Sequence, residues 1–377
     1  MERIKSMMDD GIAEGVFPGG VILAAQGGRA LALLGVGMAA VTPKTVPIRT
    51  DTIFDLASLT KVCATALAVM KLVDVRTVGL DQSLSDLLPS APLADKGALT
   101  PRMLLSHSAG LPDWRPFFLR LTGVAPEHRK AVLREWIVRE PFAYTPGTGC
   151  LYSDLGFMLL QWVIEEKTHV TLNHYVEKTF YRPLGLKRTL FMPGGDVEKP
   201  PRAACERKRR MGPSEFAATE DCPWRKRVLQ GEVHDENSFA LGGCSGHAGL
   251  FSTAEEVFGI ANMLREHYRD ERQDFFRPET VREFWRRQDL VAEGDWALGW
   301  DTRAEEGSSA GRYFSRNSVG HTGFTGTSIW IDPAKDVTVI LLANRVHPSR
   351  ENPERIKAFR PRIHDAIMEE LGMTGNS

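Results

Sequence analysis

The chain has 377 residues, with 47 Lys and Arg against 48 Asp and Glu, and so a formal net charge of -1. This balance supplies no overall field that would attract nucleic acid or an acidic membrane surface. We therefore expect a small-molecule substrate as the partner and no nucleic acid; no oligomeric state is predicted.

The cysteines and the apolar segments indicate a reducing compartment. The five cysteines are odd in number and widely spaced, which argues against a disulfide framework and against a Cys-x-x-Cys zinc site. The N-terminus has no apolar core of signal-peptide length, and no segment approaches the roughly 18 apolar residues of a membrane span. If no leader was removed, the predicted location is the cytoplasm.

The two ends of the chain have the pattern of one shared sheet. Residues 2–15 predict a helix, and residues 19–37 predict two strands that turn at Gly27-Gly28, because a glycine pair tolerates positive φ. Three more strands are predicted within residues 311–323, 325–332 and 336–344, before a closing helix around 351–371. We predict an α/β fold of the α+β type, with an antiparallel sheet of about five strands built from both termini and flanked by helices.

The middle of the chain has helical periodicity, in residues 61–74, 128–140, 154–167 and 171–184. We predict an α/β sheet domain of residues 1–60 and 240–377, an inserted, mainly helical subdomain of residues 61–239, and an active site between them. Residues 193–239 are rich in Pro, Gly and charge and predict a polar insert that could serve as a lid. Residues 251–267 predict another helix, with Thr253 and Glu256 spaced as a capping box.

The stretch "DLASLTKVCATALAVM", residues 55–70, places Ser58 and Lys61 in a segment with the composition of a buried helix. Residues three apart share a helix face. A buried lysine has a lowered pKa and can then accept a proton from a nearby hydroxyl, which would make Ser58 a nucleophile. The alternative is that Lys61 reaches solvent and Ser58 only caps the helix.

Two other segments supply companions for this pair. Tyr152, in "LYSDLG", precedes a predicted helix, and a tyrosine beside a lysine can act as a general base. His321, Thr322 and Gly323, in "VGHTGFTG", lie on a predicted strand, where Gly323 would let a substrate approach the backbone. The alternatives are a packed aromatic residue and an ordinary glycine-rich strand edge.

Together the three motifs, Ser-x-x-Lys, Tyr-x-Asp and His-Thr-Gly, resemble those of the serine β-lactamase and penicillin-binding superfamily, in its class C-like branch. The stretches "MLLSHSAGLPDW", "TPGTGCLYSDLGFMLL", "YRPLGLKRT" and "GHAGLFSTAEEV" also look like this family. The resemblance covers roughly residues 15 to 345. Residues 231–256 and 320–352 are similar to the group that includes N-acetylmuramoyl-L-alanine amidases and related peptidoglycan-recycling hydrolases.

The resemblance implies roles for particular residues. Ser58 would be the acylated nucleophile, Lys61 and Tyr152 its proton-transfer partners, and the backbone N–H groups of Ser58 and Phe324 the oxyanion hole. Substrate contacts are expected from a further set, namely Asp154, His321, Thr322, Gly323, Trp114 and His234. His107, near Trp114, is expected to be structural.

Two positions depart from the usual pattern of the family. His321 stands where lysine is usual, which removes a permanent cation from the site that meets a substrate carboxylate, so we expect weak β-lactam hydrolysis at most. Asp154 stands where asparagine is usual and could raise the pKa of Lys61, which favours Tyr152 as the base.

In "VHDEN", we expect Asp235 and Asn237 to lock a loop through hydrogen bonds, with His234 placed in the cleft or in the same structural role. Cys244 and His247, three residues apart in "GGCSGHAG", are read as part of a tight turn rather than as a thiol nucleophile with its base. The histidines have no metal-binding spacing, and no metal or cofactor is expected.

The resemblance implies a serine hydrolase that cleaves an amide or ester through an acyl-enzyme, with a peptidoglycan-derived muropeptide as the expected substrate. Two enzymatic alternatives use the same machinery, a small-acyl esterase and a D-amino-acid peptidase or carboxypeptidase with weak β-lactamase activity. A third alternative is a sensor or binding module that is acylated and does not turn over.

Overall fold

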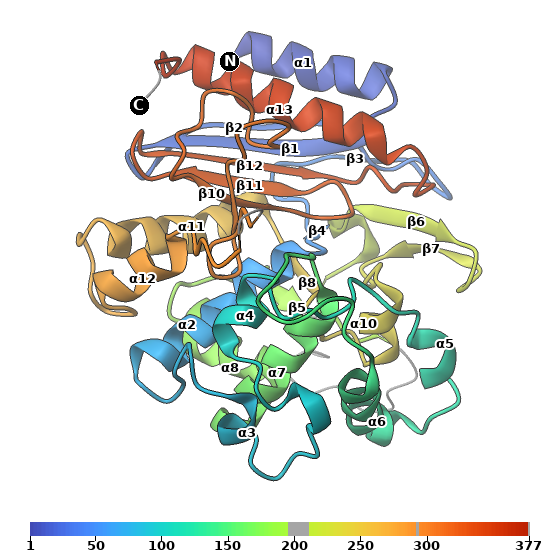
Figure 1. Cartoon of the computed structure of the whole chain (residues 1–377). Coiled ribbons are helices and arrows are strands. Elements are labelled where there is room, and N and C mark those ends of the chain that lie inside the picture. The colour runs from blue at the N-terminus through green and yellow to red at the C-terminus, as the bar shows by residue number, and fades with distance from the viewer. Residues whose placement is uncertain (195–210, 292–293, 376–377) are drawn as a thin grey trace.

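A seven-stranded antiparallel sheet forms one layer of the computed structural model, which describes residues 1–194, 211–291 and 294–375 (Figure 1). The strand order is β3-β2-β1-β12-β11-β10-β9. The strands are β1 (Gly19–Gln26), β2 (Arg29–Ala40), β3 (Val46–Pro47), β9 (Asp301–Thr302), β10 (Val319–Thr322), β11 (Ser328–Asp332) and β12 (Val337–Ala343).

The predicted fold class is confirmed, but the strand count is seven rather than about five. The two additional strands, β3 and β9, have two residues each and lie at the sheet edges, so they carry no periodic signal. The strand expected within residues 311–323 is confined to β10, because residues 311–318 form turns.

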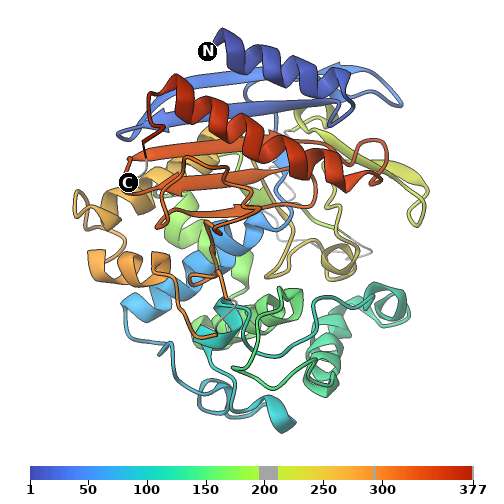
Figure 2. The same cartoon turned by 45° about the horizontal axis from the view of Figure 1, so that its top comes forward.

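The termini meet in the middle of the sheet, where β1 pairs with β12 from Gly20↔Ala343 to Gln26↔Val337. Alternate side chains of these strands enter two different cores, as the pleat requires. Ile22 and Leu341 pack under α1 (Glu2–Ala13) and α13 (Pro353–Glu370), whereas Leu23 and Leu342 face the remaining helices. Figures 1 and 2 show α1 and α13 side by side across one face of the sheet.

The larger apolar core lies on the opposite face of the sheet. The helical segments that the structure describes outside α1 and α13 are η1 (a π-helix, Lys61–Thr65), α2 (Ala66–Asp74), α3 (Leu84–Leu87), η2 (Ala94–Lys96), α4 (Pro101–Leu105), α5 (Phe118–Leu121), α6 (Pro126–Arg139), α7 (Asp154–Thr168), α8 (Leu172–Val176), η3 (a π-helix, Glu177–Tyr181), η4 (Pro213–Glu215), α10 (Glu236–Ala240), α11 (Ala254–Tyr268) and α12 (Pro278–Trp285). Each predicted helix therefore has a counterpart, although two of them contain π-helical segments.

Two smaller sheets complete the described chain. One contains β4 (Phe54–Asp55), β8 (Leu250–Ser252) and β5 (Leu190–Phe191), and the other is the hairpin of β6 (Ala218–Cys222) and β7 (Arg227–Gln230). The predicted helix at 251–267 accordingly begins only after β8. Thr253 caps it, but the Glu256 carboxylate accepts the backbone N–H groups of Lys187 and Arg188, so half of the expected capping box forms.

Of the polar insert expected at residues 193–239, residues 195–210 lie outside the described residues. The remainder is not a simple polar loop, because Phe216 and Val233 are buried against Phe251 in an apolar cluster of their own. The division into domains at residues 60 and 240 stays a prediction.

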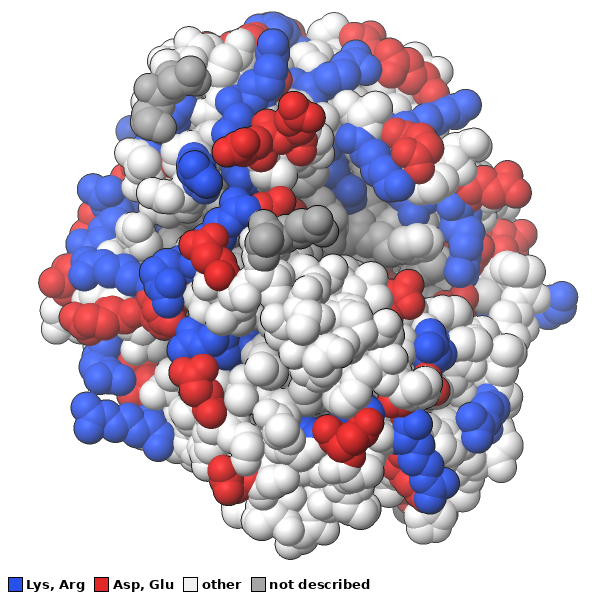
Figure 3. Space-filling model, in the orientation of Figure 1, with Lys and Arg blue, Asp and Glu red and all other residues white. Residues whose placement is uncertain are grey.

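The described helices include none that is both long and apolar enough to cross a lipid bilayer. On the face seen in Figure 3, cationic and anionic side chains are interspersed, in keeping with the balanced charge.

Asn344 ties the end of β12 to the first two strands. Its Oδ1 accepts the backbone N–H of Gly19 at 3.2 Å, and its Nδ2 donates to the carbonyl oxygens of Ala39 at 3.0 Å and Met38 at 3.4 Å. The residue is 1% exposed, so these groups have no access to bulk water. A donor at Nδ2 is required here because the facing backbone groups are both acceptors.

Replacement of Asn344 by aspartate should therefore destabilise the sheet. At neutral pH a carboxylate would face two carbonyl oxygens with no proton to donate, and we expect the free energy of unfolding to fall by about 2 kcal/mol or more. Urea denaturation of Asn344→Asp, beside the exposed control Asn317→Asp, measures this loss. Equal stability of the two variants would contradict the role assigned to Asn344.

Candidate active site

Ser58 lies at a sharp turn between β4 and η1, not within the first turn of a regular helix as predicted. Ala57 has a φ of +48°, in the left-handed region that non-glycine residues rarely adopt. The carboxylate of Asp55 holds this turn by accepting the backbone N–H groups of Ala57 at 2.9 Å and His234 at 2.6 Å. The strained backbone directs the Ser58 side chain out of the core and into a pocket.

Lys61 is fully buried, and its three ammonium protons have three acceptors. Nζ donates to Ser58 Oγ at 3.1 Å, to Asp154 Oδ1 at 2.7 Å and to the carbonyl oxygen of His247 at 3.2 Å. Burial lowers the pKa of Lys61, but Asp154 and the phenol of Tyr152 outweigh it, so that the pKa is raised above its usual value. Lys61 is thus an ammonium in the resting site, in accord with the effect expected of Asp154.

Tyr152 lies beside this ammonium, with its ring centroid 4.7 Å from Lys61 Nζ. Burial raises the pKa of the phenol most strongly, and the charge of Asp154 raises it further. The charge of Lys61 and hydrogen bonds from Lys61 and Ser58 lower the pKa but do not cancel the rise. The phenol is therefore protonated at rest, and the Lys61 and Tyr152 pair must lose one proton before either can act as a base.

His107 holds the loop that carries Tyr152. Its Nδ1 accepts the backbone N–H of Ser153 at 3.0 Å, and its carbonyl oxygen accepts the backbone N–H of Leu151 at 3.0 Å. The imidazole also packs on the phenol, with ring centroids 4.7 Å apart. These contacts fix the residues on both sides of Tyr152. The expected structural role of His107 is confirmed, with the addition that it positions a candidate catalytic group.

The turn after β10 binds directly to the Ser58 turn. Thr325 Oγ1 donates to the carbonyl oxygen of Asp55 at 2.8 Å, and Thr327 Oγ1 donates to that of Leu56 at 3.0 Å. A Cβ on Gly323 would lie 2.0 Å from Thr327 Oγ1 and 2.6 Å from the Leu56 oxygen. A glycine is therefore required at position 323, because the turn after β10 lies so close to the Ser58 turn. Gly323 also lines the pocket, where a substrate was expected to approach the backbone.

His321 is a neutral hydrogen-bond acceptor. Nδ1 faces the carbonyl oxygen of Thr322 at 2.9 Å and must carry the proton, since a carbonyl only accepts. Burial and the charge of Lys61 lower the pKa of His321 to about 3. The other nitrogen, Nε2, is buried and has no hydrogen-bond partner among the described residues. This position of the third motif thus offers a lone pair where a lysine would offer protons.

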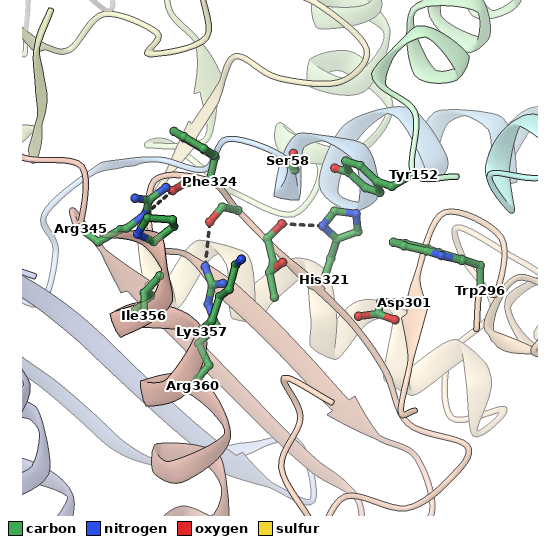
Figure 4. A pocket seen from close by; sticks show the side chains of 13 residues that line it. Ser58, Tyr152, Trp296, Asp301, His321, Phe324, Arg345, Ile356, Lys357 and Arg360 are labelled. Carbon is green, nitrogen blue, oxygen red and sulfur yellow. Dashed lines mark hydrogen bonds between the residues drawn. The ribbon is translucent and has the colours of Figure 1, made fainter. Parts of the chain in front are cut away.

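These residues surround a cavity of about 490 Å³ (Figure 4). Ser58, Tyr152 and Phe324 lie around its centre, with His321 between Tyr152 and the sheet. One end contains three basic residues, Arg345, Lys357 and Arg360, and the other contains Trp296 and Asp301. None of these five residues was predicted from sequence, because no motif marks them.

Of the residues expected in the site, Ser58, Tyr152, His321, Thr322, Gly323 and Phe324 line the cavity. Lys61 and Asp154 lie beneath Ser58 and form the ion pair described above. The structure does not place Trp114 or His234 in the lining. His234 is 4% exposed and stacks on the Phe324 ring at a centroid distance of 5.6 Å, which supports the structural alternative for it. Substrate contact by Trp114 stays a prediction.

Asp235 and Asn237 have the structural role expected of them. Asp235 caps α10 and lies 3.0 Å from His247 Nε2, and the Asn237 amide bridges the backbones of Phe118 and Arg115. Burial raises the pKa of the Cys244 thiol to about 12, which disfavours the thiolate that a nucleophile needs. No group of three His, Cys, Asp or Glu residues in the described part of the chain could hold a metal ion.

Comparison with known proteins identifies relatives of the whole chain. The model of the family described as Beta-lactamase matches residues 4–359. The chain is 31% identical, over 94% of its length and 83% of the relative's, to a protein named N-acetylmuramyl-L-alanine amidase from Bacillus subtilis. It is 33% identical to a protein of Salmonella typhimurium provisionally named as a D-alanyl-D-alanine carboxypeptidase, over 82% of this chain and 73% of the other.

Solved structures show the same fold at lower identity. The octameric penicillin-binding protein homologue from Pyrococcus abyssi has a TM-score of 0.71 and 21% identity. The match covers 99% of this chain and 78% of the homologue's chain. EstCE1, a hydrolase with promiscuous acyltransferase activity, has a TM-score of 0.70 and 23% identity. This match covers 96% of the present chain and 98% of the EstCE1 chain. These likenesses support the fold described above.

The fit of Gly323 against the Ser58 turn yields a stability prediction. In Gly323→Ala the new methyl group would overlap backbone and hydroxyl atoms that cannot both retreat, and we expect a loss of about 1 to 3 kcal/mol in the free energy of unfolding. Gly375→Ala is the matched control, since nothing lies within 4 Å of its Cβ position. Thermal or urea unfolding of both variants measures the difference, and an unchanged Gly323→Ala would refute the contact.

Proposed function

The chain belongs to the beta-lactamase family, as a hydrolase of the β-lactamase and penicillin-binding type, and from that premise we propose that Ser58 is its acylated nucleophile. The observation that carries the proposal is the position of Ser58 Oγ. It lies 3.1 Å from Lys61 Nζ, at the edge of a cavity that Tyr152 and Phe324 also line. Nucleophile, proton-transfer group and oxyanion donors would thus meet at one point.

The first step is transfer of the Ser58 proton. Lys61 is held as an ammonium by Asp154, so we assign the base role to Tyr152 in its deprotonated form, stabilised by the charge of Lys61. Ser58 Oγ then attacks the carbonyl carbon. Tyr152 returns the proton to the leaving nitrogen or oxygen, and water attacks the acyl-enzyme with Tyr152 again as base. In each half-reaction Tyr152 takes up one proton and gives it back, so that it is again deprotonated after deacylation.

Negative charge on the carbonyl oxygen would be met by two backbone donors. Within the described part of the chain, neither the N–H of Ser58 nor that of Phe324 has a hydrogen-bond partner, whereas the N–H groups of Ala57, Leu59 and Gly323 are paired. Unpaired N–H groups at a nucleophile are what an oxyanion hole requires. Phe324 is held in place by His234 on its ring and by Arg345 Nε, which donates to its carbonyl oxygen at 2.9 Å.

For the substrate we propose a peptidoglycan-derived muropeptide cleaved at the amide between the muramoyl group and alanine. The name of the Bacillus subtilis relative supports this choice. The neutral His321 supports it over a carboxypeptidase reaction, because no cation at that position would meet a terminal carboxylate. β-Lactams carry a carboxylate as well and should be poor substrates for the same reason.

We place this reaction in the cytoplasm, on fragments that have been imported for recycling. The four cysteines that the structure describes, Cys63, Cys150, Cys222 and Cys244, are free thiols. Free thiols are typical of proteins in reducing compartments.

Mass spectrometry of muramyl dipeptide incubated with the protein tests both the nucleophile and the bond. We expect the wild type to release the free dipeptide and Ser58→Ala to lose activity by a factor on the order of 10³ or more. The exposed Ser90→Ala is the matched control and should retain full activity. Turnover by Ser58→Ala would refute the nucleophile. If the wild type cleaves aryl esters but not the muropeptide, the amide substrate is wrong and the serine mechanism is judged on the esters.

The charge of Asp154 should be visible in the pH dependence. It raises the pKa of both Lys61 and Tyr152, so kcat/KM of the wild type should rise with pH into the alkaline range as their shared proton is lost. Asp154→Asn removes that charge, and the rising limb should move to lower pH. Aryl-ester hydrolysis across the pH range measures the limb, with the exposed Asp86→Asn as control. A limb that moves to higher pH would contradict this electrostatic account.

A further inference from the structure

One end of the cavity is formed by Trp296, Asp301 and His321, and we call these three residues the acceptor end. In Figure 4 they lie on the Tyr152 side of Ser58, opposite the three basic residues. β9 pairs with β10 at Asp301↔Gly320, so Asp301 lies across the ladder from the neighbour of His321. The short edge strand β9 therefore brings a carboxyl group to the edge of the sheet beside the third motif.

His321 supplies one lone pair at this end. Its side chain is 2% exposed and its Nε2 has no partner among the described residues, while Nδ1–H is occupied by the Thr322 carbonyl oxygen. A buried acceptor without a donor costs free energy that a ligand's donor can recover. The ring cannot offer a proton from Nε2 without becoming charged, and burial beside Lys61 opposes that charge.

Asp301 supplies the second acceptor. No side chain in the described part of the chain forms a hydrogen bond or ion pair with its carboxyl group. The guanidinium whose charge acts on Asp301, that of Arg287, is paired with Asp295 and with Asp289, the latter at 3.3 Å. Burial raises the pKa of Asp301 to about 7, and the backbone N–H of Thr302 and the charge of Arg287 offset this only in part. Cys150 is the other titratable group that interacts with Asp301, and burial holds its thiol neutral.

The acceptor end lies where the departing part of the substrate must go. The group that protonates the leaving atom has to be next to it, and we assigned that role to Tyr152 under the proposed function. Ser58 and Phe324 bind the carbonyl oxygen on the other side. The leaving group is thus directed past Tyr152 toward Trp296 and Asp301, and the acyl part toward the basic residues.

We propose that the acceptor end binds a primary ammonium group carried by the leaving part of the substrate. The ammonium donates to the Asp301 carboxylate and Trp296 contributes its aromatic ring, while His321 Nε2 accepts a separate donor of the leaving group. This inference rests on the proposed function for the direction of the substrate. It adds a specificity to it: the enzyme prefers amides or esters whose leaving group has a free amino group, such as a peptide with a basic residue, over those whose leaving group has a carboxylate at that position.

The test uses two leaving-group analogues of nearly equal shape, meta-(aminomethyl)phenol and meta-ethylphenol. Their binding to Ser58→Ala protein is measured by calorimetric titration at mildly alkaline pH, where Asp301 is ionised. The same titrations are made with the double variant that carries Asp301→Asn together with Ser58→Ala. The matched control is Asp86→Asn, the replacement of an exposed aspartate that lies outside the cavity.

We expect the aminomethyl compound to bind about tenfold more tightly than the ethyl compound, the size of a charge-assisted hydrogen bond in a partly buried site. Asp301→Asn should abolish this preference and leave binding of the ethyl compound unchanged, whereas Asp86→Asn should leave the ratio of the two affinities as it is. In Ser58→Ala protein with Asp301 intact, the ratio of the two affinities should also fall as the pH is lowered through about 7, because the Asp301 carboxylate becomes protonated. This pH series gives a result even if Asp301→Asn does not fold.

A ratio near one, or a ratio that Asp301→Asn does not change, would overturn the ammonium subsite. The binding experiment needs no turnover, so it judges the subsite even if Ser58 is not the nucleophile. Hydrolysis of the two acetate esters by wild type and Ser58→Ala judges the nucleophile separately. A structural role for Asp301 alone would lower the affinity for both compounds equally, and would leave the ratio unaltered.

Discussion

The site is organised around one buried ammonium. A lysine nitrogen without access to water needs a countercharge and three acceptors, and Lys61 finds them on three segments that are far apart in sequence. Ser58 precedes η1, Asp154 begins α7, and the His247 carbonyl lies in the loop before β8. Satisfying this one group therefore holds the nucleophile, the Tyr152 loop and the β8 segment in register with one another.

A second set of contacts joins the sheet to that cluster. The turn after β10 binds the Ser58 turn through the hydroxyls of Thr325 and Thr327, and Gly323 leaves room for the two backbones to meet. Of the two N–H groups that have no partner among the described residues, one belongs to the Ser58 turn and the other, that of Phe324, to the turn after β10. An oxyanion hole built from two chain segments depends on this packing, so its geometry follows from stability of the interface rather than from any local motif.

The departures from the commonest family pattern change the polarity of the cavity consistently. Asp154 keeps Lys61 charged and makes the proton of the Lys61 and Tyr152 pair harder to remove. His321 replaces a permanent cation by a lone pair, and Asp301 adds a carboxyl group beyond it. The cations of the cavity, Arg345, Lys357 and Arg360, are at the opposite end. A substrate whose charges run the other way would meet repulsion at both ends.

The sequence by itself determined the long elements and the residues at the centre of the site. Strands such as β1 and β12 and helices such as α7 are buried over many residues, so their apolar patterns are visible, and Ser58, Lys61, Tyr152 and His321 stand in spaced motifs. Only the tertiary structure decided the rest. β9 is too short to have a period, and Trp296 and Asp301 reach the cavity through its pairing with β10. Three further features depend on which backbones meet, a property of packing that no linear pattern encodes. They are the positive φ of Ala57, the lack of a partner for His321 Nε2 within the described chain, and the contact of Gly323 with Leu56.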